Sequence, residues 1–130
     1  MENNLFLDIN IVLDILIESR AEHKRAIEIL DDILDFNIFI SEDMLTTIYY
    51  ISKDKAKTLK FLEVIQDEWN IVPFGEDVIR EAVKYSQSNS SDLEDTLQCF
   101  CAKKYNCIFL TSDKKFINCG IKIFNYNNWR

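Results

Sequence analysis

Leu5-Phe6-Leu7-Asp8-Ile9-Asn10 sets the fold class, because an apolar run ends on a carboxylate and gives way at once to a helical pattern. The run is rich in Leu, Phe and Ile, which suits a buried strand. Asn10 is expected to cap the helix that follows over Ile11–Ile17. A strand that leads straight into a helix is the first part of a strand–helix–strand unit, so a parallel sheet is expected.

The rest of the chain repeats this pattern. Further strands are expected at 37–40, 69–74, 107–111 and 121–124, and helices at 21–35, 42–51 (capped by Ser41), 54–67, 76–87 and 92–105. Strands that are separated by helical crossovers pair in parallel and are covered on both faces. The sequence therefore predicts a single α/β domain over residues 1–130, a three-layer α/β/α arrangement with a mostly parallel sheet of about five strands.

The composition is that of a globular chain with its own core. The 130 residues are 48% hydrophobic and include 9 Phe, 5 Tyr and 2 Trp, which argues against disorder. No apolar run approaches the roughly 18 residues that cross a bilayer, and the N-terminus lacks the basic start of a signal peptide. We therefore expect a cytoplasmic protein without membrane contact. The cysteines form no CxxC pair and are all expected to be reduced: Cys99, Cys101, Cys107 and Cys119.

The net charge of −7 does not favour nonspecific binding to nucleic acid. Two stretches, 53–60 and 103–115, each hold four lysines against one aspartate, a local charge of +3. They could grip a nucleic acid locally, or they could be solvated helix faces. His23 is the only histidine and is expected to be plain surface.

Aspartates stand where the expected strands and helices meet. Asp8 ends the first strand, Asp113 follows the fourth, and Asp92 and Asp95 open a late helix. The carboxyl ends of parallel neighbours share one edge, where open α/β sheets place their sites. Two unit charges about 4 Å apart repel by roughly 4 kcal/mol at an effective dielectric of about 20, so such a cluster takes up protons or binds a hard cation. Oxygen ligands indicate Mg²⁺ or Mn²⁺. Each acid alone could instead serve a helix terminus, where Ser91 is a further cap candidate, or a turn.

Three motifs, in this order, resemble the PIN domain: Leu-Asp-x-Asn-Ile at 7–11, Asp-x-Glu-Asp-x-Leu-Gln at 92–98 and Leu-Thr-Ser-Asp-Lys-Lys-Phe at 110–116. The segment 40–51 and the Asn128-Trp129 tail fit the same pattern, so the resemblance covers essentially the whole chain. It implies a small α/β/α fold and a Mg²⁺- or Mn²⁺-dependent ribonuclease with RNA as substrate. Stand-alone bacterial members are often dimeric toxins that a small antitoxin protein neutralises.

The resemblance also implies a set of metal ligands. It places the family's acids on Asp8, on Asp95 with Asp92 beside it, and on Asp113. The glutamate that the family usually carries after the second strand falls on Thr47, which cannot supply a charge.

Asp43 lies one helical turn before Thr47 and is the expected partial substitute. Thr111 and Ser112 either orient Asp113, touch phosphate or form a turn.

Three functions remain open from the sequence. A metal-dependent endoribonuclease is favoured by Asp113, and a catalytically silent PIN-like module that binds RNA or protein is favoured by Thr47. A phosphatase or another doubly wound enzyme with strand-end aspartates is the third. A homodimer is expected, because the helices around 42–67 carry many large apolar residues: Met44, Tyr49, Tyr50, Phe61 and the nearby Trp69.

Overall fold

The computed structural model describes residues 3–129. Its elements, in chain order, are β1 (Asn4–Leu7), α1 (Ile9–Leu16), α2 (His23–Asp32), β2 (Asn37–Ser41), α3 (Met44–Ile51), α4 (Lys55–Glu68), β3 (Asn70–Val72), α5 (Gly75–Asn89), α6 (Leu93–Lys104), β4 (Ile108–Thr111) and β5 (Ile123–Asn125). Strands and helices thus alternate as the apolar pattern predicts.

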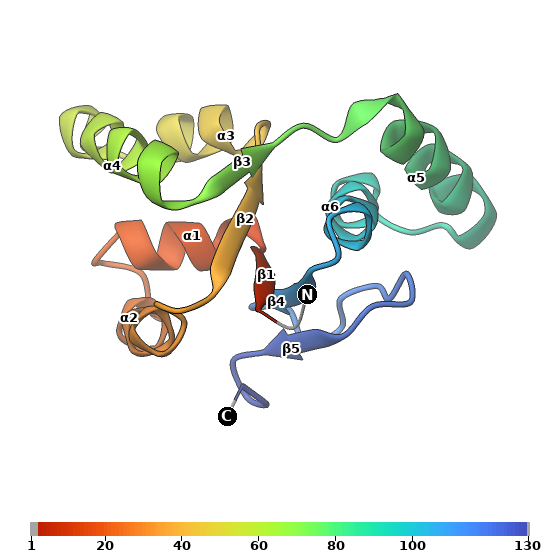
Figure 1. Cartoon of the computed structure of the whole chain (residues 1–130). Coiled ribbons are helices and arrows are strands. Elements are labelled where there is room, and N and C mark those ends of the chain that lie inside the picture. The colour runs from red at the N-terminus through yellow and green to blue at the C-terminus, as the bar shows by residue number, and fades with distance from the viewer. Residues whose placement is uncertain (1–2, 130) are drawn as a thin grey trace.

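The described strands form one sheet in the order β3-β2-β1-β4-β5, and every neighbouring pair is parallel. Helices α1 to α4 lie on one face of the sheet and α5 and α6 on the other, so the molecule has three layers (Figure 1). The predicted α/β/α fold with a parallel sheet of five strands is confirmed.

The first strand lies at the centre of the core. Leu5, Phe6 and Leu7 are fully buried because helices cover both faces of β1. Phe6 stands beside Phe39 of β2 and Phe109 of β4, and the rings of Phe6 and Phe109 stack with centroids 5.5 Å apart. A strand of this kind needs a continuous apolar run, which the sequence provides.

The chain changes direction next to β1. It runs outward from β1 through β2 to β3, crosses the sheet and returns to β4 on the other side of β1. In doubly wound sheets, the carboxyl ends of the two strands at such a switch point form a crevice. The residues that follow β1 and β4 therefore meet there, although they are about a hundred positions apart in the sequence.

Three predicted helix caps are wrong. Asp8, not Asn10, is the N-cap of α1, but its carboxylate makes no capping bond. Ser41 is the buried last residue of β2, and Asp43 takes the N-cap position of α3. Ser91 shares its hydroxyl with Ser86 and Thr96, so Asp92 caps α6 instead.

Two cysteines differ from the expectation that all four are reduced. Cys99 on α6 is bonded to Cys119 in the segment before β5, with their Cα atoms 6.1 Å apart. The two lie twenty positions apart in the sequence, so only the packing of this segment against α6 brings them together. Cys101 and Cys107 are free and buried, and burial raises the pKa of each thiol to about 12. These two are protected thiols rather than reactive ones.

None of the helices within residues 3–129 has the length and apolar character that crossing a bilayer requires.

Candidate active site

Asp8 anchors the candidate site at the carboxyl end of β1. Its N–H donates to the carbonyl of Leu110, which extends the β1–β4 pairing, and the residue is only 4% exposed. The hydroxyl of Thr111 donates to Asp8 Oδ2 at 2.7 Å. Burial raises the pKa of Asp8, and the Thr111 bond opposes this rise. Asp8 therefore occupies the N-cap position of α1, and Thr111 holds its desolvated carboxylate.

Thr111 joins the ends of the two central strands. It is the last residue of β4 and is fully buried. While its hydroxyl donates to Asp8, the same oxygen accepts the N–H of Asp113 at 3.0 Å. Asp113 in turn accepts the N–H of Lys115 at 2.8 Å through Oδ1, so its carboxylate sits in a tight turn. Of the roles considered for Thr111, the structure shows the turn, since its hydroxyl accepts the backbone N–H two residues on; in addition, it holds Asp8.

Asp95 comes to the same edge from the first turn of α6. Its N–H donates to Oδ2 of the N-cap Asp92 at 3.0 Å, and its side chain is half-buried. The pKa of Asp95 is raised to about 6, first by burial and then by the negative charges of Asp92, Asp8, Asp113 and Glu94. Acids from β1, from the turn after β4 and from α6 therefore act on one carboxyl group.

Glu94 is an acid of this cluster that the sequence reasoning missed. Its pKa is raised by burial and by the charges of Asp43 and Asp92, and it adds to the rise at Asp8. Its place beside Asp95 in the first turn of α6 was the available signal. Glu94 thus links Asp43, at the start of α3, to the acids of the sheet edge.

The side chains at this edge offer oxygen atoms only. Carboxylates with a neighbouring hydroxyl are the donor type that Mg²⁺ and Mn²⁺ prefer. Within residues 3–129, however, no three Asp, Glu, His or Cys side chains already surround one ion position. In the described part of the chain, Ser41 Oγ and Gln98 Oε1 are buried without a hydrogen-bond partner. The donor set suits a hydrated ion, since Mg²⁺ usually keeps several of its waters.

The PIN domain family model matches residues 5–122, which is nearly the whole chain. The chain belongs to the PIN domain family.

Relatives of this PIN domain are known by sequence and by structure. Ribonuclease VapC1 of Aquifex aeolicus (strain VF5) is 36% identical over 126 residues, which cover 92% of this chain and 88% of the relative. A toxin–antitoxin complex from Klebsiella pneumoniae superposes with a TM-score of 0.75 at 16% identity, covering 94% of this chain and 97% of that one. VapC20 of Mycobacterium tuberculosis, a Sarcin-Ricin loop cleaving toxin, also gives a TM-score of 0.75, at 11% identity, covering 86% and 92% of the two chains. At these low identities the structural matches show the fold.

This PIN domain departs from the family pattern on α3. Thr47 is half-buried on that helix, at the position where the resemblance expects a glutamate. Asp43 is exposed one turn earlier and acts electrostatically on Glu94. The pair Asp43 and Glu94 supplies negative charge on the side of the cluster where the glutamate is absent.

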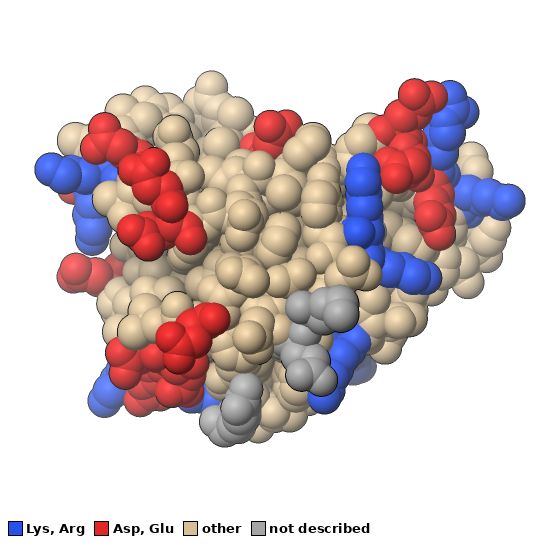
Figure 2. Space-filling model, viewed as in Figure 1, with Lys and Arg blue, Asp and Glu red and all other residues tan. Residues whose placement is uncertain are grey.

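Several lysines that the sequence offered for RNA binding have structural partners in this PIN domain. Lys55 donates to three backbone carbonyls at the end of α3, and Lys104 pairs with Asp77 at 3.0 Å. Lys103 donates to the carbonyl of Cys119. On the face seen in Figure 2, basic and acidic side chains are mixed, and no broad basic patch covers it. Some lysines of the stretches 53–60 and 103–115 therefore stabilise the fold and are not free to bind RNA.

Proposed function

We propose that this PIN domain is a metal-dependent endoribonuclease that acts as the toxin of a toxin–antitoxin pair. The observation that carries the proposal is the convergence of Asp8, Asp92, Glu94 and Asp113 on Asp95, whose pKa rises to about 6. Perturbed acids that gather at a switch point are typical of functional sites. The 36% identity to a protein named a ribonuclease supports RNA as the substrate, and an RNA substrate implies action in the cytoplasm.

In this proposal Asp8, Asp95 and Asp113 hold Mg²⁺ or Mn²⁺, directly or through its waters, and Asp92 and Asp43 add charge around them. A bound ion supplies a hydroxide nucleophile at neutral pH and offsets charge on the scissile phosphate. The negative charges of these acids repel one another in the metal-free protein. A bound cation offsets this repulsion, so the repulsion favours metal binding.

The chain's own residues fix the geometry. Thr111 ties the carboxylate of Asp8 to the turn after β4, because its hydroxyl bonds both that carboxylate and the backbone N–H of Asp113. The N-cap bond from Asp95 to Asp92 fixes where α6 begins. Burial of Asp8 limits competing water at that carboxylate. Positioning of this kind is what a metal-assisted phosphodiester cleavage requires of the protein.

Cleavage of a labelled single-stranded RNA tests the proposal. Wild-type protein is expected to cut slowly in Mn²⁺ or Mg²⁺ and to stop when a chelator is added, and Asp95→Asn is expected to abolish cutting. Asp67→Asn is a matched control, since Asp67 is an exposed acid of α4. Intact RNA across a broad panel of structured and unstructured substrates with saturating Mn²⁺ would argue against the enzyme.

In that event the second candidate applies, a catalytically silent module that binds RNA or protein. Thr47 favours it, because a threonine cannot replace the carboxylate that the family pattern expects there. Binding of RNA without cleavage in the same panel, with or without metal, is the expected result for this candidate.

The partners are proposals as well. We infer an antitoxin protein from the fold matches to toxin–antitoxin complexes such as the one from Klebsiella pneumoniae.

We also infer a homodimer through α3 and α4, where Tyr50 is 77% exposed and Ile51, Leu59 and Val64 are exposed as well. Of the apolar residues that suggested pairing, Met44 belongs to the core, and Phe61 and Trp69 pack against each other. Light scattering at high protein concentration tests the dimer, and a monomeric mass removes it.

A further inference from the structure

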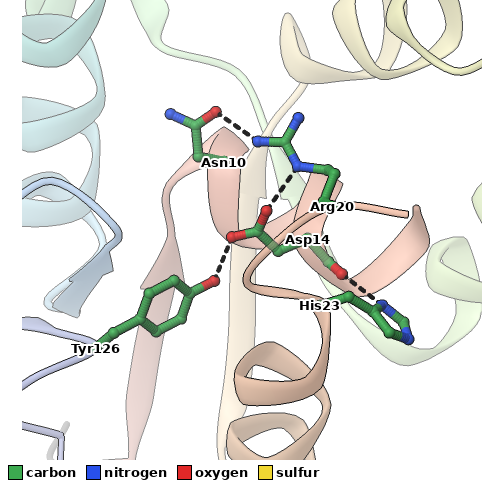
Figure 3. Close-up of polar contacts among 5 residues, drawn as sticks. All are labelled: Asn10, Asp14, Arg20, His23 and Tyr126. Atoms are coloured by element: carbon green, nitrogen blue, oxygen red, sulfur yellow. Dashed lines mark hydrogen bonds and ion pairs between the residues drawn. The ribbon is translucent and has the colours of Figure 1, made fainter. Parts of the chain in front are cut away.

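A buried acid of α1 holds an arginine that reaches back to the start of the same helix. Asp14, on α1, has a side chain that is only 5% exposed, whereas the side chain of Arg20 is 32% exposed. Arg20 Nε donates to Asp14 Oδ1 at 2.6 Å, and the hydroxyl of Tyr126 donates to Asp14 Oδ2 at 2.6 Å (Figure 3). His23 Nδ1 donates to the backbone carbonyl of Asp14 at 2.8 Å, so the expectation that His23 is plain surface is wrong.

The guanidinium points back toward the start of α1. Arg20 follows α1 in the chain, yet its Nη2 reaches Asn10 Oδ1 at 3.4 Å (Figure 3). Asn10 is exposed and lies two residues after Asp8, the buried acid of the candidate site. The positive charge therefore lies near the first turn of α1, which follows Asp8, although Arg20 itself comes after the end of that helix.

The bond to Asp14 leaves most N–H donors of the Arg20 guanidinium free to bind another group. An arginine usually pairs with a carboxylate through two parallel N–H bonds, which occupy both of the acid's oxygens. Here Arg20 contacts Asp14 through Nε alone, and Tyr126 donates to the other carboxylate oxygen. No bond to Nη1 is found within residues 3–129, and Nη2 has only the long contact to Asn10. Phosphate oxygens accept from such a group with good geometry.

A small hollow continues from this network to the turn that carries Asp113. It measures about 190 Å³, and Tyr126 lines it together with Ser112 and Lys114, which flank Asp113 in the chain. The hollow thus runs from Tyr126 to the residues on either side of Asp113, and Glu22 lines it as well. An RNA strand that lies across the acidic edge needs a cationic contact near this point, because the carboxylates repel its phosphates.

We propose that Arg20 binds an RNA phosphate next to the one that is cut, and that Asp14 and Tyr126 are positioning residues for it. This rests on the proposed function for the identity of the strand. It adds to that function a binding residue outside the acidic cluster. Arg20 makes the contact, Asp14 fixes the direction of its side chain, and Tyr126 holds the carboxylate of Asp14 in place.

The test measures RNA binding without cleavage. The parent is Asp95→Asn, and a short fluorescent single-stranded RNA is titrated by anisotropy in Mg²⁺ at several salt concentrations. Arg20→Gln is expected to raise Kd about tenfold and to reduce the slope of log K against log salt by about 0.7, the loss of one phosphate contact on a single strand. Arg80→Gln is the matched control, because Arg80 forms an exposed pair with Glu76 on α5, and it should change neither quantity.

A second variant guards against unfolding. Arg20→Gln leaves the buried Asp14 without its cation, whereas Asp14→Asn/Arg20→Gln removes both charges and avoids that penalty. The double variant should show the same reduced slope. A neutral methylphosphonate at one position of the RNA should weaken the parent but not either Arg20 variant, a coupling that a purely structural arginine would not produce.

The outcomes separate this proposal from the proposed activity. If wild-type protein cuts RNA but the folded Arg20 variants keep the parent's slope and Kd, Arg20 serves only Asp14 and the inference is overturned. If nothing is cut but the slope falls as expected, the phosphate contact stands and the activity does not. If the parent binds no RNA at all, both are overturned.

Discussion

Replacing Asp95 by asparagine should stabilise the protein at neutral pH. The pKa of this carboxyl group is about 6 in the folded chain against an ordinary value of 3.8, and burial followed by four neighbouring acids is the cause. Folding therefore disfavours the charged form. The loss in the free energy of unfolding is largest when Asp95 is fully ionised. A residue that lowers stability in this way is expected where metal binding requires its charge.

The expected gain can be bounded. That pKa difference corresponds to at most about 3 kcal/mol, and screening by solvent around a half-exposed side chain reduces it to about 1 kcal/mol. The folded state binds the proton more tightly than the unfolded state, so stability falls as pH rises from about 4 to about 6 and is then constant. Below about pH 4 both states are protonated and the advantage of Asp95→Asn should disappear.

Thermal unfolding of wild type and Asp95→Asn across pH measures this. For a chain of 130 residues, 1 kcal/mol shifts Tm by about 4 °C. The variant should melt higher at pH 7.5 and equally at pH 4, and Asp67→Asn should follow wild type throughout. Mn²⁺ should raise the Tm of wild type more than that of the variant. A variant that melts lower at every pH would mean that Asp95 only stabilises the start of α6.

Three further changes test separate features. Thr111→Val removes the buried hydroxyl that joins Asp8 to Asp113, so urea unfolding should show a loss of about 2 kcal/mol together with weaker cutting; unchanged stability would show that the hydroxyl is dispensable. Thr47→Glu should tighten Mn²⁺ binding in titration calorimetry, because it adds a carboxylate to an oxygen site, and equal or weaker affinity would mean that the assignment of this helix position is wrong. Cys119→Ser should lower stability by about 3 kcal/mol under oxidising conditions; with a reductant present it should match wild type, and a difference that persists there would point to packing instead of the bond.

The elements of this fold could be read from the apolar pattern, but their ends could not. The helix expected at 21–35 is shorter at both ends, His23–Asp32, and the strand expected at 69–74 pairs with β2 only over Asn70–Val72. Ends of this kind depend on which partner strand or helix is present, and a single sequence does not specify that. The order of the strands, β3-β2-β1-β4-β5, was not predicted, because no local signal in the sequence specifies which strands become neighbours.

The candidate site divides in the same way. Asp8 and Asp113 could be proposed because each directly follows an expected strand, and the carboxyl ends of parallel strands share one edge. Asp95 could be proposed because it opens an expected helix of the same chain. The cap at Asn10 was misplaced because α1 already begins at Ile9, while the bond that holds Asp8, from Thr111, spans 103 positions. The link between Asp14 and Tyr126 spans 112 positions, and no spacing rule connects two such residues. Contacts of this length exist only once the sheet has formed.

The pairing of β1 with β4 also determines when in the protein's synthesis the acidic edge can exist. Asp8 leaves the ribosome early, but Thr111 and Asp113, which complete the edge, are made about a hundred residues later. Since β4 pairs with β1, the edge around Asp8 cannot form until the residues through Asp113 have been made. A nascent chain whose synthesis has not passed residue 113 therefore lacks the last acid of the proposed site and cannot use that site to cut RNA.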